Sequence, residues 1–309
     1  MLSGKIHSLS VLSIHGADAS AFLQGQLTTD VSTLCKEWQL TGYCSPKGRL
    51  LALLYLFKKG ENEFCALVSK EISDSITKRL RMYVLRSHVE ITENPYTHIY
   101  AFKDYNDLVK LKPKCQKLAN TLLVDTTDRQ LTILDNEAVL FQGQQALFLC
   151  EGSSLPTKVD ENNYDDAWAR HNIDAGIPTI NKDTAELFVP QMINLDLLNG
   201  INFKKGCYTG QEIVARVHYL GKLKQRMFVC DITPLDQTIN DFKIHIGDKI
   251  VRKSTSSPIT VGNIVSTANG FTRCLAVLKL DTYSNNDLTL ENGIKIKVSA
   301  QQPYKIIKD

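Results

Sequence analysis

The hydrophobic pattern changes near residue 221, and no other feature of the sequence constrains the fold as strongly. Beyond this point short apolar runs follow one another closely, and the turn pairs Gly247-Asp248, Gly262-Asn263 and Asn269-Gly270 separate them. The runs cover residues 227–232, 244–251, 259–266, 274–280 and 294–298. Short strands at this spacing are typical of a small all-β barrel or sandwich. We therefore divide the chain into residues 1–222 and a C-terminal β-domain over residues 223–309.

Residues 1–222 mix helices with strands. Helices are expected over 18–27, with Asp18 as the capping residue, and over 70–85 and 165–175. Strands are expected at 50–57, 64–68, 89–91, 99–102, 122–124, 131–134 and 146–149. Residues 41–49, punctuated by glycine and proline, predict a hairpin turn that leads into the first of these strands. Isolated helices among strands favour an α+β fold over a regular parallel sheet.

Composition narrows the class of protein. The chain has 309 residues, of which 43% are hydrophobic and 22% charged, as in a soluble globular protein. Its net charge of +3 gives no argument for stable nucleic-acid binding. No apolar run reaches the roughly 20 residues that span a bilayer, and the N-terminus lacks the apolar core of a signal peptide. We therefore expect a cytoplasmic protein without a membrane partner.

The cysteines are scattered along the chain. They are Cys35, Cys44, Cys65, Cys115, Cys150, Cys207, Cys230 and Cys274. No two of them form a C-x-x-C pair, which argues against a zinc site or a self-contained iron–sulfur site, so we expect no bound metal. In a chain of this size the pattern indicates reduced thiols in a cytosolic compartment.

The most informative short stretch is residues 204–216, Lys-Lys-Gly-Cys-Tyr-Thr-Gly-Gln-Glu-Ile-Val-Ala-Arg. Thr209 and Glu212 have the spacing of a capping box, in which the threonine caps a helix and the glutamate bonds back to the cap. The apolar residues of this helix are Ile213, Val214, Val217 and Leu220. Their helical spacing predicts that one face of the helix is buried.

Cys207 lies in this stretch between Gly206 and Gly210, which allow positive φ or the close approach of another group. The free N–H groups of a helix start favour anions, and Lys204 and Lys205 are close in sequence, so both features favour the thiolate of Cys207. The ordinary alternative is a small, buried, unreactive cysteine. The flanking residues favour a functional thiol.

Four stretches together resemble the YgfZ family, a folate-binding branch of the glycine-cleavage T-protein (aminomethyltransferase) superfamily. They are residues 22–30, 47–49, 168–178 and 205–212. The resemblance implies an α+β, T-protein-like folate-binding region of two interwoven subdomains over residues 1–222, and a small β-barrel over residues 223–309. It also implies an accessory protein that binds tetrahydrofolate or a derivative. Such a protein supports the maturation or repair of iron–sulfur enzymes, including those that modify tRNA, so its partners are folate and iron–sulfur client enzymes.

The resemblance also implies site residues. Trp168 stands where the family has a tryptophan implicated in folate binding, and an indole stacks well on a flat heteroaromatic ring. Asp30 is suited to accept hydrogen bonds from pterin N–H groups, or to cap the following turn. The other cofactor-binding candidates are Gln26, Tyr208, Gln211 and Glu212. The other motif residues are Lys205, Gly206, Gly210 and Arg216.

Three further positions bear on the same site. Lys47 and Arg49 either meet a folate glutamate tail or a protein partner, or form a solvated turn. The family carries a second tryptophan near the N-terminus, and Leu9 or a neighbour stands in its place here. Trp168 is therefore the tryptophan on which the implied folate contact depends.

Two other functions compete with the accessory role. A tetrahydrofolate-dependent aminomethyl transferase needs a carboxylate to orient the reacting amine and has no evident need for a thiol. A cysteine-dependent hydrolase or transferase needs a base, most often histidine, and His218 is the histidine closest to Cys207 in sequence. Substitution of Cys207 by serine distinguishes the accessory role from the aminomethyl transferase, because it abolishes a thiol function and leaves aminomethyl transfer largely intact.

Overall fold

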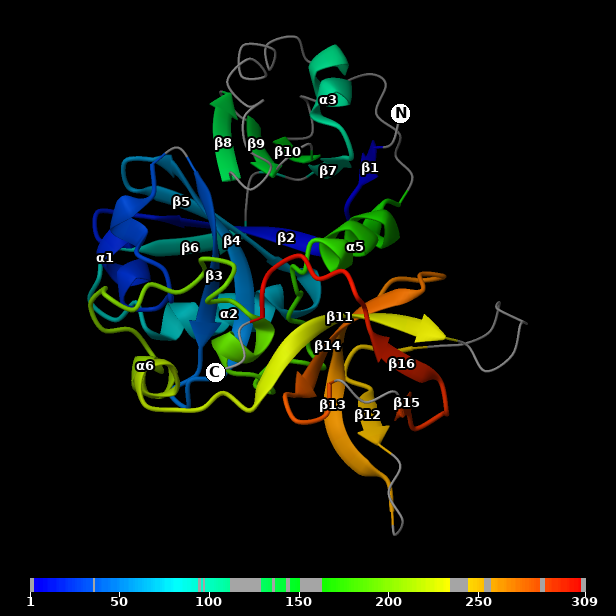
Figure 1. The fold of residues 1–309 in the computed structure, drawn as a ribbon. Helices are drawn as coiled ribbons and strands as arrows, with labels where there is room; N and C mark the ends of the chain where they lie inside the picture. Colours follow the sequence, from blue (N-terminus) through cyan, green and yellow to red (C-terminus); the bar gives the residue numbers. More distant parts are fainter. Residues whose placement is uncertain are drawn as a thin grey trace. The chain divides into compact units, whose positions relative to one another are not determined.

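The computed structural model describes residues 3–35, 37–93, 96, 98–111, 129–134, 137–142, 145–150, 163–233, 244–252, 257–283 and 287–306. Cys115 and the strand predicted at 122–124 lie outside these residues. Contacts group the chain into two compact units (Figure 1). The first unit is Met1–Thr41 with Leu54–Trp168, and the second is Gly42–Leu53 with Ala169–Asp309.

An antiparallel sheet of five strands lies in the first unit, in the order β1-β7-β10-β9-β8. Its strands are β1 (Ser3–Lys5), β7 (His98–Phe102), β10 (Gln145–Cys150), β9 (Glu137–Gln142) and β8 (Arg129–Leu134). Large side chains, including those of Tyr100, Phe102 and Phe148, are at most 1% exposed. The short helix α3 (Tyr105–Leu111) contacts β7 and β10.

A second five-stranded sheet has the order β3-β4-β5-β2-β6. Its strands are β3 (Trp38–Cys44), β4 (Leu50–Gly60), β5 (Glu63–Ser69), β2 (Leu9–His15) and β6 (Glu90–Glu93). Helix α2 (Lys70–Met82) contacts β2, β5 and β6 and buries Ile72, Ile76 and Leu80. β3 and β4 form the predicted hairpin, and their turn residues belong to the second unit. Both sheets agree with the predicted α+β class.

The first predicted helix is shorter than expected and is capped differently. α1 covers Ala19–Gln24, and the side chain of Asp18 makes no capping hydrogen bond to it. The Asp18 carboxylate instead accepts a hydrogen bond of 2.7 Å from the backbone N–H of His88. The prediction of Asp18 as a side-chain cap is therefore wrong, because a tertiary contact uses the carboxylate.

The second unit contains a closed six-stranded barrel, which confirms the predicted C-terminal β-barrel. In barrel order its strands are β11 (Gln225–Thr233), β14 (Arg273–Lys279), β13 (Ile259–Ser266), β12 (Lys249–Arg252), β15 (Leu288–Leu290) and β16 (Lys295–Val298). Its interior is apolar, with Ile264, Ala276 and Leu278 fully buried. The boundary at residues 222 and 223 stays a prediction about separable domains.

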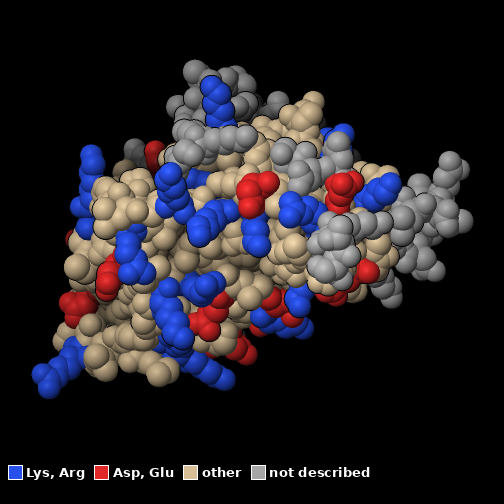
Figure 2. All heavy atoms as spheres, turned by 60° about the horizontal axis from the view of Figure 1, so that its bottom comes forward, with Lys and Arg blue, Asp and Glu red and all other residues tan. Residues whose placement is uncertain are grey.

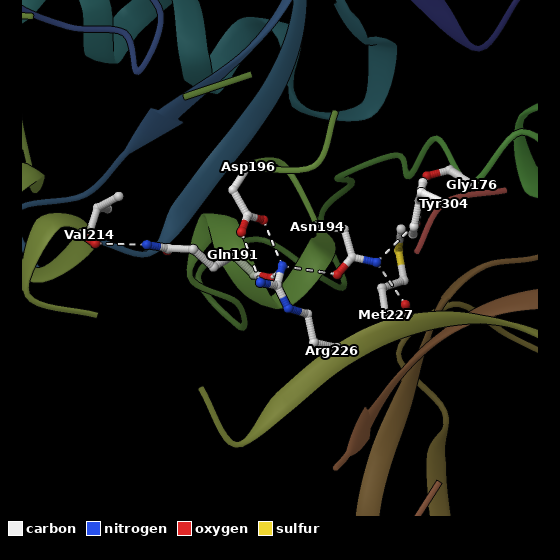
Figure 3. A network of polar contacts seen from close by, with 8 residues as sticks. All are labelled: Gly176, Gln191, Asn194, Asp196, Val214, Arg226, Met227 and Tyr304. Atoms are coloured by element: carbon white, nitrogen blue, oxygen red, sulfur yellow. Dashed lines mark hydrogen bonds and ion pairs between the residues drawn. The ribbon is translucent and has the colours of Figure 1, made fainter. Parts of the chain in front are cut away.

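A polar network joins β11 to the segment that precedes helix α6 (Gln211–Tyr219) in the second unit (Figure 3). Arg226 donates to both carboxylate oxygens of Asp196, at 2.7 and 2.9 Å. Asn194 donates to the carbonyl oxygen of Met227 at 2.7 Å and to the hydroxyl of Tyr304 at 2.9 Å. A bidentate charged pair at partly buried positions fixes both orientation and distance. The network therefore ties the first barrel strand to the region that carries the Cys207 stretch.

Two further contacts extend this network. The Tyr304 hydroxyl donates to the carbonyl oxygen of Gly176 at 3.2 Å, just after helix α5 (Asp165–Asp174). The amide of Gln191, in the 3-10 turn η3 (Pro190–Ile193), donates to the carbonyl oxygen of Val214 at 2.7 Å. Helix α6 is thereby held at its middle by a buried side chain.

Candidate functional site

The Cys207 stretch rests on the turn between β3 and β4. Gly48 has φ +68 and Gly210 has φ +83, both in the left-handed region that favours glycine. A Cβ atom on Gly210 would lie 2.4 Å from the carbonyl oxygen of Ser45 and 2.9 Å from the Cα of Gly48. A Cβ atom on Gly48 would lie 2.6 Å from the Cβ of Ile213. The two glycines therefore allow the turn and the start of α6 to meet backbone to backbone.

The predicted capping box is wrong. Helix α6 begins at Gln211 and its N-cap is Gly210, which makes no side-chain capping bond. A left-handed residue directly before the helix moves Thr209 one position too far out to act as the cap. Glu212 therefore lies in the first helical turn as an exposed acidic residue, where the helix dipole favours a negative charge.

The apolar face of α6 is buried only in part, in contrast to the prediction. Val214 is fully buried, and Ile213 and Val217 are half-buried. Leu220, at the end of the same stripe, is 85% exposed. Helical periodicity identified the apolar stripe correctly, but the protein covers this stripe only in part and leaves Leu220 exposed.

Two buried residues hold the chain on either side of Cys207. Lys205 is 9% exposed, and its Nζ lies 5.3 Å from the centroid of the Tyr208 ring, within the range of a cation–π contact. Tyr208 is 7% exposed. Burial, and then the nearby thiol of Cys44, raise the pKa of the Tyr208 hydroxyl well above its ordinary value of 10.0. The motif residues Lys205 and Tyr208 thus anchor the loop.

Cys207 itself is exposed between these anchors. No residue of the described segments forms a hydrogen bond or ion pair with its side chain, and these segments contain no cluster of three or more His, Cys, Asp or Glu suited to a metal. Gly206 has no positive φ, and a Cβ atom there would meet nothing within 4 Å. The fold therefore does not need glycine at position 206, and the space before Cys207 is open.

His218 does not act as a partner of Cys207. Its ring stacks on Phe203, with the centroids 3.7 Å apart and the planes inclined by 10°. Tyr219 adds an edge contact to the same pair. Gln211 is half-buried and Arg216 is exposed, both on α6. The contacts of His218 remove the specific support for a cysteine hydrolase with this base.

Lys47 and Arg49, the two basic residues of the turn between β3 and β4, differ in the contacts that they make. Arg49 donates to the backbone carbonyl oxygen of Leu187 and so fixes the start of β4. Lys47 is exposed. Arg49 is exposed as well, so the solvated-turn alternative holds for both residues, and the Arg49 guanidinium has a structural role in addition. The sequence pattern predicts this turn but not its contact with the Cys207 stretch, because no local pattern indicates contacts between residues so far apart along the chain.

The remaining predicted residues lie in the first unit. Asp30 caps the turn η1 (Val31–Thr33), and its Oδ1 accepts hydrogen bonds from the N–H and hydroxyl of Ser32 and from the amide of Gln24. This confirms the turn-capping alternative. Trp168 is half-buried on α5. The structure thus describes Gln26, Asp30 and Trp168 in one unit, and Cys207 with its motif neighbours in the other.

Two of the first-unit residues have features that bear on a folate. The Oε1 atom of Gln26 is buried and accepts no hydrogen bond from any described residue. Such an orphaned acceptor is costly unless a ligand or water satisfies it, and a pterin presents N–H donors. The half-buried indole of Trp168 also keeps part of its surface accessible to a flat ring.

Comparisons with known proteins agree with one another. The chain is 32% identical over 226 residues to the tRNA-modifying protein YgfZ of Buchnera aphidicola, covering 70% of this chain and 69% of that protein. It is 30% identical over 316 residues to the tRNA-modifying protein YgfZ of Pectobacterium carotovorum, covering 94% of this chain and 88% of that protein. No protein-family model matches the chain.

One solved structure supports the fold. The glycine cleavage system aminomethyltransferase T from Bartonella henselae aligns with 97% of this chain and 85% of its own, with a TM-score of 0.71. The sequence identity is 12%, so this likeness establishes the fold alone. Among the helices of the described segments, none is long and apolar enough to cross a membrane.

Proposed function

The chain belongs to the YgfZ family, and on that premise we propose that it is a tRNA-modifying accessory protein of the bacterial cytoplasm that acts through the thiol of Cys207. In this proposal it binds tetrahydrofolate or a derivative and supports the maturation or repair of iron–sulfur enzymes, including those that modify tRNA. One observation carries the proposal. Cys207 is exposed, while the residues around it are held by buried side chains and by the contact between Gly48 and Gly210.

A fixed loop that presents a free thiol suits chemistry with a partner. One cysteine does not hold an iron–sulfur cluster alone, because clusters normally take four thiolates. Cys207 therefore acts transiently, with the ligands of a client enzyme or as a redox thiol. The open space at Gly206 supports this role, since the approaching group meets no side chain there.

Deletion and rescue test the thiol. Cells that lack the gene are supplied with the wild type, Cys207→Ser or Cys35→Ser, and thiolated tRNA nucleosides and iron–sulfur enzyme activities are measured. We expect rescue by the wild type and by Cys35→Ser, which removes the other exposed thiol among the described residues, and no rescue by Cys207→Ser. Full rescue by Cys207→Ser would falsify the thiol function and favour the alternative, a tetrahydrofolate-dependent aminomethyl transferase.

The residues of the first unit that we propose to bind folate are Trp168, Gln26 and Asp30. Bound, the folate would supply a one-carbon carrier on a reduced pterin ring. Tryptophan fluorescence tests the site because the chain has only two tryptophans. Trp38 is 3% exposed, with the ring of Tyr55 at 5.2 Å and the Arg129 guanidinium at 4.9 Å, so it serves as an internal reference.

Titration with tetrahydrofolate is expected to quench the tryptophan fluorescence of the wild type. Trp168→Phe should abolish most of the quenching, and Gln26→Leu should weaken binding about tenfold, because it removes the orphaned acceptor that a pterin N–H satisfies. Quenching that is unchanged in Trp168→Phe, or absent in the wild type, counts against this site. Tyr208, Gln211 and Glu212, for which the resemblance also implies folate binding, are tested on their own. Tyr208→Phe removes the hydroxyl and keeps the buried ring that anchors the loop.

A further inference from the structure

A hollow of about 880 Å³ lies at the C-terminal end of α6, within the second unit. Part of its lining is apolar, from Val189, Met192, Val217, Leu223 and Leu280. Its volume is within the range of pockets that bind ligands or anchor side chains. The hollow therefore offers room for one or more large apolar groups.

The apolar surface continues outside the hollow. Leu220 is 85% exposed and Tyr219 is 63% exposed, and the chain runs from them directly into Lys222 at the edge of the hollow. The half-buried Val217 and the exposed Leu220 belong to the C-terminal part of the apolar stripe of α6. Large exposed apolar side chains next to a hollow are typical of an interaction surface.

The border of the hollow is basic. Lys222, Lys224 and Lys279 line it together with one acidic residue, Asp281. Lys222 and Lys224 are exposed, so their charges act on an approaching molecule. Figure 2 turns the lower side of Figure 1, where α6 is drawn, toward the viewer. Lys and Arg side chains are numerous on this face, and Asp and Glu side chains lie among them.

From this combination we propose that the α6 hollow, with Tyr219 and Leu220 beside it, is the docking site for an acidic amphipathic segment of a client protein. The aliphatic lining suits apolar anchor side chains, and the lysines complement acidic residues around those anchors. Single-stranded nucleic acids are bound largely by rows of aromatic rings on which successive bases stack. The lining of the hollow has no aromatic ring and no arginine, and Tyr219 is the one aromatic ring of the proposed surface. A small ligand would leave the exposed Leu220 uncovered.

The proposal rests on the proposed function and deepens it. Val217 lies six residues beyond the first residue of α6, which corresponds to about 9 Å along the helix axis at about 1.5 Å per residue. A client segment held in the hollow would thus lie on the same helix that begins four residues after Cys207. The docking site gives the exposed thiol a client to act on.

Peptide selection tests the site on the full chain. A display library of random peptides is selected on the wild type, and the affinity of a selected peptide is measured by fluorescence anisotropy. We expect selected peptides to combine at least one large apolar residue with Asp and Glu, and their binding to weaken as salt rises. Lys222→Glu with Lys224→Glu should weaken binding about tenfold or more.

A matched control makes the same change of charge elsewhere. Lys295→Glu with Lys297→Glu alters two exposed lysines on β16 and should leave affinity within about twofold. Leu220→Asp should weaken binding about tenfold without unfolding the protein, because the side chain is exposed.

Several results would overturn the proposal. One is that the selected peptides lack acidic residues, and another is that both pairs of lysine substitutions reduce peptide affinity equally. A third is that the substitutions reduce tRNA binding and not peptide binding, and a fourth is that Leu220→Asp changes self-association alone. Cys207→Ser separates this proposal from the thiol function, because it should keep peptide affinity unchanged. If Cys207→Ser also rescues cells fully, the thiol function fails while the docking site stands.

Discussion

Gly48 and Gly210 face each other so closely that neither has room for a side chain. Their backbones meet between the β3–β4 turn and the start of α6, and both have positive φ. The contact joins residues that are 162 positions apart in the sequence. It is the point at which the hairpin turn supports the loop that carries Cys207.

Gly210→Ala should destabilise the protein strongly. The new methyl group would meet the carbonyl oxygen of Ser45 at 2.4 Å, and alanine disfavours φ +83. Left-handed strain and overpacking together predict a loss of about 2–4 kcal/mol in the free energy of unfolding, measured by denaturant titration.

Gly206→Ala is the matched control for this prediction. It adds the same methyl group four residues earlier in the same loop, at an ordinary φ and with nothing within 4 Å. We expect a change within about 0.5 kcal/mol. Equal losses in the two variants would contradict the role of the Gly48–Gly210 contact. Reduced rescue by a stable Gly206→Ala would indicate that a partner approaches this position.

The ion pair between Arg226 and Asp196 should contribute far more to the free energy of unfolding than the surface ion pairs do. Their side chains are 13% and 15% exposed, and the pair is bidentate. Asp196→Asn leaves Arg226 without its counter-charge, so we expect a loss of about 2–3 kcal/mol in denaturant unfolding. Asp174→Asn provides the comparison, since its partner Arg273 is 33% exposed and the expected loss is below about 1 kcal/mol.

The barrel was predictable because its turns punctuate the sequence. Turn pairs that contain glycine and short apolar runs identified five of its strands, whereas β15 has three residues and leaves too short a pattern. The turn predicted at Gly262-Asn263 is wrong, because both residues lie within β13. β2 was missed, although Leu9–His15 is central to its sheet, because its apolar residues alternate irregularly with serines. Local periodicity thus identifies elements that are long and regular.

The site was predictable only as a motif. The sequence of residues 205–212 singled out Cys207, but the support from Gly48 depends on a tertiary contact that no local pattern encodes. The same limit explains why the exposure of Leu220 was not predicted. Helical spacing indicates which residues share a face, and it does not indicate whether the rest of the protein covers them.

Stability should fall in alkaline solution from about pH 9. Burial raises the pKa of the Cys44 thiol from 9.0 to about 12. The folded protein therefore keeps this proton between pH 9 and 12 while the unfolded chain loses it, so the contribution of Cys44 is complete below pH 9 and is lost as the pH rises to 12. Each such proton contributes a slope of about 1.4 kcal/mol per pH unit.

Two variants show which residues cause this fall of the unfolding free energy with pH. Cys44→Ala should reduce the slope of unfolding free energy against pH from pH 9 upward. Tyr208→Phe should reduce it only above pH 10, because burial raises the pKa of Tyr208 from an ordinary value of 10.0. Unfolding curves measured at intervals across this range give both slopes. An unchanged slope in Cys44→Ala would show that its thiol ionises equally in the folded and unfolded chains.

Thiol labelling of the folded protein should separate the cysteines into two groups. Cys35 and Cys207 are exposed and should react rapidly with iodoacetamide. The buried cysteines are Cys44, Cys65, Cys150, Cys230 and Cys274. They should react only after unfolding, because the reagent needs access to the sulfur. Peptide mass spectrometry reports each site separately, with urea-unfolded protein as the reference for full labelling.

Gly210→Ala connects this measurement to the loop. If the Gly48–Gly210 contact holds the loop, its loss should expose the protected Cys44, which directly precedes the turn, and raise its labelling rate at least about tenfold. Gly206→Ala should leave Cys44 protected. Labelling of Cys44 that is equally slow in both variants would mean that the turn is held without the glycine contact, and the rigid presentation of Cys207 would then need another explanation.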